Sequence, residues 1–553
     1  MTLPPAPRPP FVPALLRAGA VAYVLAGLWL MVAAAPRVPY ADPWRFLVGF
    51  LDTPFPASAL AADNGHREVL PNLVRIAELR WFDYDQTLQI GLAALLAVVA
   101  LGLAVRRLRP APVAVRAAAL PLLAIGMFWF GNERKLAHGN EALPLFLVQT
   151  LLALGLGALL ARRRSAPAAW FAGGCGIAAT MTFGAGAACL PAFVVVAWLL
   201  RAPWRQWLPL LVSAALAAAL LLLGNAGAEP AAGFAPLDRL DQLLRWLGAP
   251  FVWLLHPLLA SDHAARLPTD LLSAPALLVA QPVEAAFGPS LGARWPAAAF
   301  GLLALLRLVW STCCHRRDHD PAPQRTFALG LAWFGLGVGG LVVAARFHYF
   351  QQHPEQLTTA RYVPWSMLLW TGLGLDFVLQ PGRRARTANV LALACLVAFV
   401  PSSWWTGRAA WKRWRTAELT ALGAAVGALD RDFPLVETRE LDLLAAVPRL
   451  QARGAVMFAW PETKVLGERL PPERWQQLDH VDDLVVRATT NLFAGPCAAA
   501  TFVLPGAPIG RLLLVDGDDV VVGLAMHCGP GHTCAGWLRR EVPAAALRVG
   551  VLR

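Results

Sequence analysis

Long apolar runs separated by polar connectors occupy the chain as far as residue 405. Eleven of them reach or approach the length of about 20 residues that a helix needs to cross a hydrocarbon core of about 30 Å. They are residues 15–35, 87–106, 112–131, 142–161, 168–187, 188–201, 207–224, 296–311, 326–345, 363–380 and 388–405, of which 188–201 suits a tilted or partial span. The pattern predicts a mainly α, polytopic membrane protein with about eleven transmembrane helices.

The start of the chain differs from this pattern. Residues 1–14 are rich in proline and predict a disordered cytoplasmic tail. Arg8, Arg17 and the small residues 33–35 around the first run are also features of a signal peptide. Because further apolar runs follow, an uncleaved anchor is the favoured interpretation.

After residue 405 the composition becomes charged and mixed. RAAWKRWRTAELTALGAAVGAL and ETRELDLLAAVPRLQ predict helices, and IGRLLLVDGDDVVVGLAM predicts two strands joined at Asp516-Gly517. ALRVGVL predicts a closing strand. The sequence therefore predicts a tail at 1–14, a transmembrane domain at 15–405 and a small C-terminal α+β domain at 406–553.

The short basic connectors indicate an orientation. They lie at residues 106–109, 162–164, 201–205, 316–317 and 383–386, and an N-terminus inside with eleven crossings places all five in the cytoplasm. The longer segments 36–86, 132–141, 225–295, 346–362 and 406–553 then lie outside. The amphipathic pieces of 225–295 are expected to lie in the plane of the interface. The connectors therefore predict a multi-pass membrane protein with a cytoplasmic N-terminus and a C-terminal domain on the outer face.

Composition narrows the classes of function. The chain is 57% hydrophobic and only 15% charged, below the quarter that is usual for globular domains. Its net charge of +13 is concentrated beside the apolar runs, so we do not expect a nucleic-acid partner. It has no Gly-rich Lys-Ser/Thr phosphate loop, no G-x-S-x-G and no H-E-x-x-H. The runs also carry no series of acids of the kind used in proton relays, which disfavours pumps.

The first outer segment, 36–86, holds the most candidate chemistry. Asp42 follows the first run closely, and a partly desolvated carboxylate there suits a general base acting on a hydroxyl. It could instead cap a helix that begins at Pro43. Asp63, His66 and Arg67 form a polar group before an amphipathic helix, and arginines there could bind a phosphate. A turn followed by an interfacial helix explains the same residues.

Two further outer segments carry ionisable residues. Residues 132–141 contain Glu133 and Glu141 with two cations between them, which could complete a site or be ordinary solvated loop charges. Residues 346–362 contain Arg346, Arg361 and Tyr362, placed to hold an anionic lipid phosphate or to anchor the chain at the interface.

Cysteine and histidine clusters do not predict a metal site. Cys313, Cys314, His315 and His319 lack zinc spacing and lie in an inner basic connector. Cys528 and Cys534 lie outside, where thiols oxidise, so a disulfide between them is favoured over zinc, with Cys497 as a possible competitor.

The layout resembles bacterial polytopic glycosyltransferases of the GT-C type, which use polyprenyl-phosphate sugars. The resemblance rests on Tyr40-Ala41-Asp42-Pro43-Trp44, on Gly65-His66-Arg67 with Pro71, and on Ala360-Arg361-Tyr362, together with the many spans and the outer C-terminal domain. It implies that Asp42 is the base that deprotonates the acceptor, that Glu133 or Glu141 is the second-loop acid, and that Arg361 contacts the donor phosphate. The chain lacks the paired acids of better-known members in its first loop, which leaves metal dependence open.

The resemblance implies a membrane enzyme that transfers a hexose or pentose from a polyprenyl-phosphate lipid to a glycan, lipid or protein acceptor of the cell envelope. No other cofactor is implied. Two alternatives remain from the residues themselves. One is a non-enzymatic envelope or transport protein that binds lipid or polysaccharide. The other is a lipid-linked oligosaccharide ligase or polymerase using polar residues of 225–295, which include His256, Asp262 and His263.

Overall fold

The computed structural model describes residues 11–63, 66–161, 165–222, 235–259, 261–287, 295–318, 322–381, 385–435, 437–505, 510–527 and 533–553. These residues form two compact units, each assembled from separate parts of the chain. The first unit comprises residues 1–34, 60–71 and 90–410, and the second comprises 35–59, 72–89 and 411–553. The first outer segment is therefore divided, since residues 60–71 belong to the first unit and its flanks to the second.

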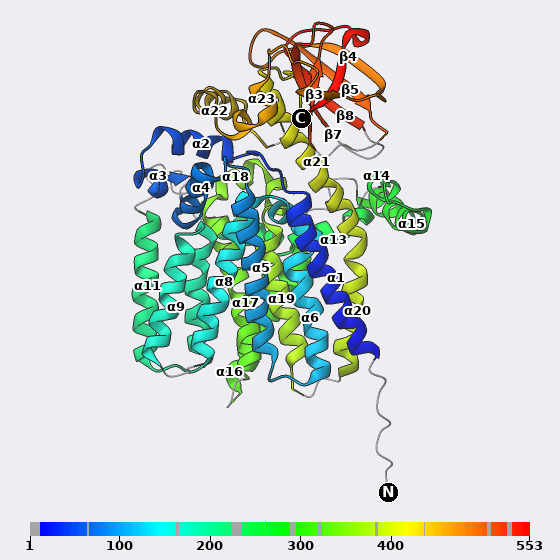
Figure 1. Ribbon diagram of the computed structural model, residues 1–553. Helices are drawn as coiled ribbons and strands as arrows, with labels where there is room; N and C mark the ends of the chain where they lie inside the picture. The colour runs from blue at the N-terminus through cyan, green and yellow to red at the C-terminus, as the bar shows by residue number, and fades with distance from the viewer. Residues whose placement is uncertain are drawn as a thin grey trace. The chain divides into compact units, whose positions relative to one another are not determined.

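The first unit is a bundle of apolar helices (Figure 1). Each of the eleven predicted runs lies on a helix: α1 (Phe11–Ala33), α5 (Thr87–Leu108), α6 (Val113–Phe128), α8 (Gly139–Ala161), α9 (Ala166–Thr180), α10 (Cys189–Leu199), α11 (Trp204–Leu222), α16 (Trp295–Arg317), α17 (Pro323–Ala345), α19 (Val363–Leu379) and α20 (Ala385–Ala398) with α21 (Val400–Val426). Within the described ranges, eight helices are long and apolar enough to cross a membrane, and two shorter apolar ones span 184–199 and 363–379.

The predicted run 168–187 is shorter in the structure than in the sequence analysis. Helix α9 ends at Thr180 and is followed by the 3₁₀ helix η2 (Gly184–Ala188). The hydroxyls of Thr180 and Thr182 donate to carbonyls of the preceding turn, at 2.9 and 2.8 Å. At Gly186 a Cβ atom would lie 2.0 Å from the Ala179 carbonyl oxygen, so only glycine permits this close return of the chain.

Several connectors of the first unit lie at one end of the bundle, the end at which α1 starts (Figure 1). They are the α5–α6, α10–α11 and α16–α17 connectors, and Arg201 donates to the Arg316 carbonyl oxygen across two of them at 3.0 Å. The predicted outer segments 132–141 and 346–362 occupy the opposite end. They form η1 (Phe130–Asn132), α7 (Glu133–Leu136), α18 (Phe347–Gln352) and η4 (Pro354–Thr358).

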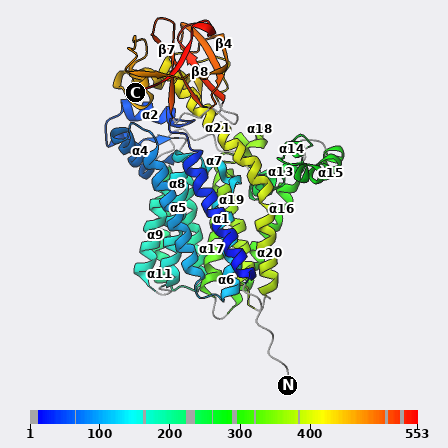
Figure 2. The same ribbon diagram turned by 45° about the vertical axis from the view of Figure 1, so that its right-hand side comes forward.

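The segment predicted at 225–295 is helical where it is described. It contains α12 (Pro236–Leu247), α13 (Ala249–Leu259), α14 (Ser261–Ala265) and α15 (Asp270–Phe287). Helix α12 packs against α16 and α17 and buries Trp246 completely. Helices α14 and α15 project sideways from the bundle in both views (Figures 1 and 2).

The second unit joins helices of the first outer segment to a C-terminal sheet domain. Its helices are α2 (Pro43–Asp52), α3 (Ala57–Leu60), most of α4 (Val69–Trp81), the end of α21, α22 (Glu440–Arg453), η5 (Val456–Ala459), α23 (Pro461–Lys464) and η7 (Ala544–Ala546). Helix α2 packs on α22, where Arg449 pairs with Asp52 at 2.9 Å and Arg453 donates to the Leu51 carbonyl oxygen at 2.8 Å.

The sheet is antiparallel, in the order β3-β9-β6-β7-β8-β5-β4. Its strands are β3 (Trp475–Gln477), β4 (Asp482–Thr490), β5 (Pro496–Val503), β6 (Arg511–Val515), β7 (Val521–His527), β8 (Thr533–Leu538) and β9 (Arg548–Leu552). The predicted hairpin at Asp516-Gly517 is confirmed as β6–β7, and the predicted closing strand is β9. The Asp516 carboxylate accepts from the Asp518 and Val520 amides at 2.9 and 3.0 Å, which fixes the turn.

Candidate functional site

The ionisable residues of 132–141 are buried rather than solvated. Only 1–7% of the surface of each of four residues is exposed: Glu133, Arg134, Lys135 and His138. They lie at the end of the bundle opposite the start of α1. Charged groups are removed from water only when they are paired, and inside membrane proteins such residues mark functional sites. The interpretation of these residues as ordinary solvated loop charges is therefore wrong.

Glu141 organises this group. Its carboxylate accepts from Arg134 at 2.7 Å and also pairs with the Lys135 ammonium. Arg134 lies 2.9 Å from the His138 Nδ1 atom, which is also 3.6 Å from the Glu141 carboxylate. A carboxylate held by two cations is a weak proton acceptor, so Glu141 suits a positioning role.

The residues predicted in 346–362 lie together around one phenol ring. Arg346 donates through Nη1 to the Tyr362 hydroxyl at 3.2 Å, and the Arg361 guanidinium lies 5.1 Å from the centre of the Tyr362 ring. Arg361 also donates to Gln356 at 3.0 Å, while its buried Nε atom has no hydrogen-bond partner among the described residues. Neither arginine forms an ion pair with a carboxylate in the described part of the chain. This leaves two cationic, planar donors beside Tyr362, the geometry that suits an oxyanion ligand.

An aromatic bridge joins these two groups. The Phe183 ring, in the turn between α9 and η2, receives the Lys135 ammonium at 5.1 Å from its centre. The same ring stacks on Trp365 with centres 5.8 Å apart and planes 7° apart, and Trp365 is one turn after Tyr362 on α19. Sequence reasoning singled out the small residues of 173–191 but missed Phe183, because a single phenylalanine between apolar runs carries no distinguishing pattern.

Part of the first outer segment reaches the same turn. The Leu70 amide, at the start of α4, donates to the Met181 carbonyl oxygen at 3.3 Å. Arg67 lies in β2 (His66–Arg67), which pairs with β1 (Ala62–Asp63), and its Nε atom is buried with no partner among the described residues. The side chains of Asp63 and His66 lie outside the described part of the structure. Residues 181–183 thus contact the first outer segment through Leu70, the second through Lys135, and helix α19 through Trp365.

Asp42 belongs to the second unit. It occupies the position before α2, with Pro43 as the first helical residue, but its side chain makes no capping hydrogen bond. Its carboxylate pairs with Arg45 at 3.2 Å and its side chain is 49% exposed. Asp42 therefore occupies the predicted N-cap position but does not form the capping hydrogen bond. Its carboxylate stays accessible to a ligand.

The cysteine clusters have the following positions. Cys534 is buried in β8, whereas Cys528 and His532 lie outside the described residues, so their disulfide stays a prediction. Cys497 is buried in β5, where burial raises the pKa of its thiol. Among the described residues no three His, Cys, Asp or Glu side chains are grouped as ligands for one metal ion.

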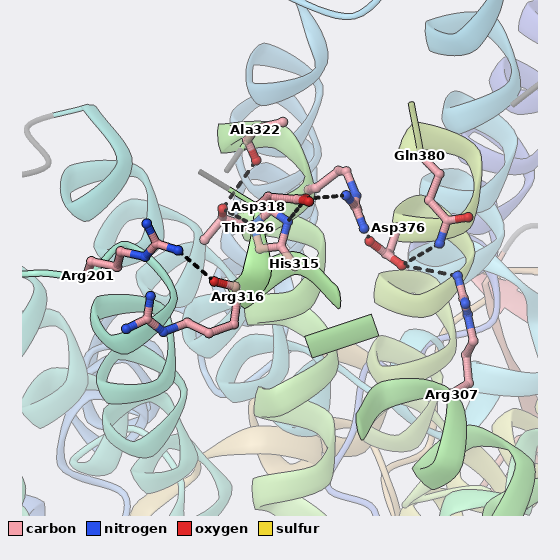
Figure 3. Close-up of polar contacts among 10 residues, drawn as sticks. Arg201, Arg307, His315, Arg316, Asp318, Ala322, Thr326, Asp376 and Gln380 are labelled. Atoms are coloured by element: carbon pink, nitrogen blue, oxygen red, sulfur yellow. Dashed lines mark hydrogen bonds and ion pairs between the residues drawn. The ribbon is translucent and has the colours of Figure 1, made fainter. Parts of the chain in front are cut away.

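His315, from the inner cluster, takes part in a buried polar network (Figure 3). Its Nε2 atom lies 2.8 Å from the Thr326 hydroxyl, and its Nδ1 atom lies 3.8 Å from Asp318. Nearby, the fully buried Asp376 accepts from Arg325 at 3.0 Å and from Arg307 at 3.2 Å. These ion pairs connect α16, α17 and α19, a structural role that the isolated position of Asp376 in the sequence did not reveal.

Two histidines of the 225–295 segment also meet. His256 and His263 stack with ring centres 3.9 Å apart, and both contact the Trp405 ring at just over 5 Å. Burial, together with the neighbouring His263, lowers the pKa of His256 to about 4, although Asp262 opposes this shift. His256 is therefore neutral near pH 7.

These features define an integral membrane protein of the mainly α class, with charged side chains buried between its helices and an antiparallel C-terminal sheet domain. No protein-family model matches the chain, and no curated protein matches it in sequence.

One similar solved structure is the archaeal oligosaccharyltransferase AglB from Archaeoglobus fulgidus, determined in complex with an inhibitory peptide and a dolichol-phosphate. The similarity has a TM-score of 0.35 and 12% sequence identity, and it covers 77% of this chain. It covers 61% of the AglB chain, less than two thirds of its length.

Proposed function

We propose that the protein is a membrane glycosyltransferase that moves a hexose or pentose from a polyprenyl-phosphate lipid to a cell-envelope acceptor at the outer face of a bacterial inner membrane. The observation that carries the proposal is the pair of arginines at Tyr362. Arg346 and Arg361 both contact this residue, and no described carboxylate neutralises either of them. Two such guanidiniums suit a phosphate that gains negative charge as it leaves the sugar.

In the proposed reaction the acceptor oxygen forms a bond to the anomeric carbon while the bond from that carbon to the phosphate oxygen breaks. The acceptor proton passes to a carboxylate, for which Glu133 is the candidate in the unit that holds the two arginines, and the lipid phosphate leaves with the electron pair. Asp42, the base that the resemblance implies, belongs to the second unit and stays a prediction. Arg361 and Arg346 stabilise the phosphate. Glu141 keeps Arg134 and Lys135 in place beside Phe183.

The test is transfer by the purified protein in lipid nanodiscs, with radiolabelled polyprenyl-phosphate hexoses and pentoses as donors and extracted envelope lipid and glycan as acceptors. Arg361→Gln is expected to lower kcat/KM by about 100-fold or more, the usual effect of removing one donor to a developing oxyanion. Glu133→Gln is expected to abolish transfer while donor binding is retained.

Arg266→Gln is the matched control, because Arg266 is also in an outer segment of the first unit but is 64% exposed. It should leave kcat/KM within twofold. Absence of released polyprenyl phosphate with every donor, or normal transfer by Arg361→Gln, would overturn the proposal. Donor binding without transfer would favour a non-enzymatic lipid-binding protein.

A lipid-linked oligosaccharide ligase is the second candidate, favoured by the stacked pair of His256 and His263. The neutral His256 can accept a hydrogen bond from an acceptor hydroxyl. In the same assay with lipid-linked oligosaccharide as donor, His256→Ala would then be inactive and Glu133→Gln active. The glycosyltransferase proposal predicts the reverse.

A further inference from the structure

A small pocket lies wholly within the second unit. Arg346 and Arg361 belong to the first unit, so this pocket is separate from the site proposed above. Its volume is about 180 Å³. It is lined by Arg37, Phe82, Asp83, Asp85, Val456, Ala459, Trp460 and Pro461. Three separate parts of the chain therefore build it: the segment after α1, the turn between α4 and α5, and the segment from η5 into α23.

The α4–α5 turn holds its polar groups in a fixed position. Asp83, Tyr84 and Gln86 all have positive φ, at 47°, 56° and 61°, a conformation that non-glycine residues adopt rarely. Tyr84 and Gln86 are completely buried, and Gln86 donates to the Val38 carbonyl oxygen. Because these two residues anchor the turn, Phe82, Asp83 and Asp85 remain exposed at the pocket.

The carboxylates of the pocket differ in their bonding. Asp85 accepts from the Thr87 amide at 2.9 Å and from the Thr87 hydroxyl at 2.8 Å, and Arg37 donates to that hydroxyl at 3.1 Å. Asp83 makes no hydrogen bond or ion pair with any residue that the structure describes. The pocket thus contains one carboxylate fixed by its neighbours and one whose oxygens are available to accept from a ligand.

Aromatic surface supplies the rest of the lining. Phe82 is 43% exposed, and Trp460 is half-buried with the Arg511 guanidinium 3.4 Å from the centre of its ring. That contact fixes the indole, because Arg511 also lies 4.0 Å from Glu462. The fixed indole offers apolar area at little cost in side-chain entropy, and the exposed Phe82 ring adds to that area.

The ligand class follows from size and charge. The volume is below the roughly 300–1,000 Å³ of sites for drug-sized ligands, so it admits one ring and excludes a nucleotide or a lipid chain. Two carboxylates against one arginine disfavour an anion, and carboxylate oxygens accept from hydroxyl groups. The C–H face of a pyranose or furanose ring matches the aromatic surface, while its hydroxyls match Asp83, Asp85 and Arg37.

We propose that this pocket binds a single neutral sugar ring of a glycan. Within the transferase function proposed above, on which this assignment rests, the bound sugar ring belongs to the acceptor rather than to the lipid-linked donor. The second unit then contributes acceptor selection, and the binding step itself needs neither the donor lipid nor catalysis.

The test is saturation-transfer difference NMR on the full-length protein in detergent, with methyl glycosides of neutral hexoses and pentoses as probes and no donor lipid present. At least one probe is expected to bind saturably. Asp83→Asn should raise the Kd of that probe by about tenfold or more, which corresponds to about 1.4 kcal/mol. Asparagine tolerates the positive φ of this position, so the variant keeps the turn. Phe82→Ala should weaken binding to a similar extent.

Asp483→Asn is the matched control, since Asp483 is also exposed, also in the second unit and also at positive φ, 52°. It should leave Kd within twofold. Binding of none of the neutral glycosides, or equal binding by Asp83→Asn, would overturn the inference. Because donor lipid is absent, none of these outcomes depends on transfer. Conversely, if Arg361→Gln transfers normally while Asp83→Asn loses sugar binding, the transferase proposal fails and the pocket stands.

Discussion

At the scale of single residues, the outer segments differ in how they treat charge. Glu141 is shared by two cations, whereas Arg361 has a buried Nε atom without a partner in the described residues. A charge that is compensated inside the protein positions its neighbours, and an uncompensated one is available to a ligand. This difference assigns Glu141 a structural role and Arg361 a ligand-binding one, although the sequence alone presents both as charged residues of outer segments.

Glu78 is a buried acid whose ionisation should control stability. Burial raises the pKa of Glu78 from 4.5 to about 7. Hydrogen bonds from the Gln89 side chain and from the Leu88 amide, the latter at 2.7 Å, favour the charged form and oppose this shift. The folded state then binds the proton more tightly than the unfolded state does. The free energy of unfolding should therefore fall as pH rises from about 4.5 through 7.

Glu78→Gln should remove this loss. It is expected to match the wild type at pH 5 and to be more stable at pH 8 by up to about 3 kcal/mol, as measured by thermal unfolding in detergent. The side-chain amide N–H of the introduced glutamine can donate a hydrogen bond to Gln89 Oε1, which is buried without a partner among the described residues. Glu473→Gln, at an exposed acid of the same unit, is the control. Parallel pH profiles for wild type and Glu78→Gln would contradict the prediction.

At the scale of elements, close approach between helices holds the first unit together. Helices α17 and α19 pack through small residues, and a Cβ atom on Gly372 would lie 2.4 Å from the Ala328 carbonyl oxygen. Membrane helices lack a hydrophobic drive to associate, so this close contact supplies much of their affinity.

Gly372→Ala should push α19 away from α17. Overpacking of this kind costs about 1–3 kcal/mol, and it should appear as a lower midpoint of thermal unfolding. Gly340→Ala on α17 is the matched control, because a Cβ atom there would meet nothing within 4 Å. Equal midpoints for the two variants would show that the α17–α19 contact is not limiting.

The elements themselves were largely predictable. Apolar length located each helix of the bundle, and the Asp516-Gly517 turn located the β6–β7 hairpin, because both signals are local. The end of α9 was missed, since it depends on the return of Gly186 onto Ala179. The contacts of Phe183 with Lys135 and Trp365 also depend on packing between distant segments, which no local pattern encodes.

At the scale of the whole molecule, the chain is divided into units that do not follow its order. Residues 35–59 and 72–89 fold with 411–553, while residues 60–71 fold with the bundle. The first outer segment therefore contributes to both units. The predicted boundary at 405 lies close to the start of the C-terminal part of the second unit at residue 411.

The orientation is a prediction at this scale. The basic connectors place the C-terminus outside, so alkaline phosphatase fused after Arg553 should be active and a green fluorescent protein in the same place should be dark. Fusions truncated after Arg205 should give the opposite result. Active phosphatase at both positions would contradict the predicted topology and, with it, the outer location of the candidate site.

The Asp376 network has a consequence for biogenesis. Arg307 of α16 forms an ion pair with Asp376 and a cation–π contact with Phe377, both on α19. The ribosome adds α19 long after it has made α16. A nascent chain that has delivered α16 and α17 to the translocon still lacks this carboxylate. Helix α16 therefore gains its electrostatic partner only when α19 is inserted, which makes the assembly of these helices a late step in synthesis.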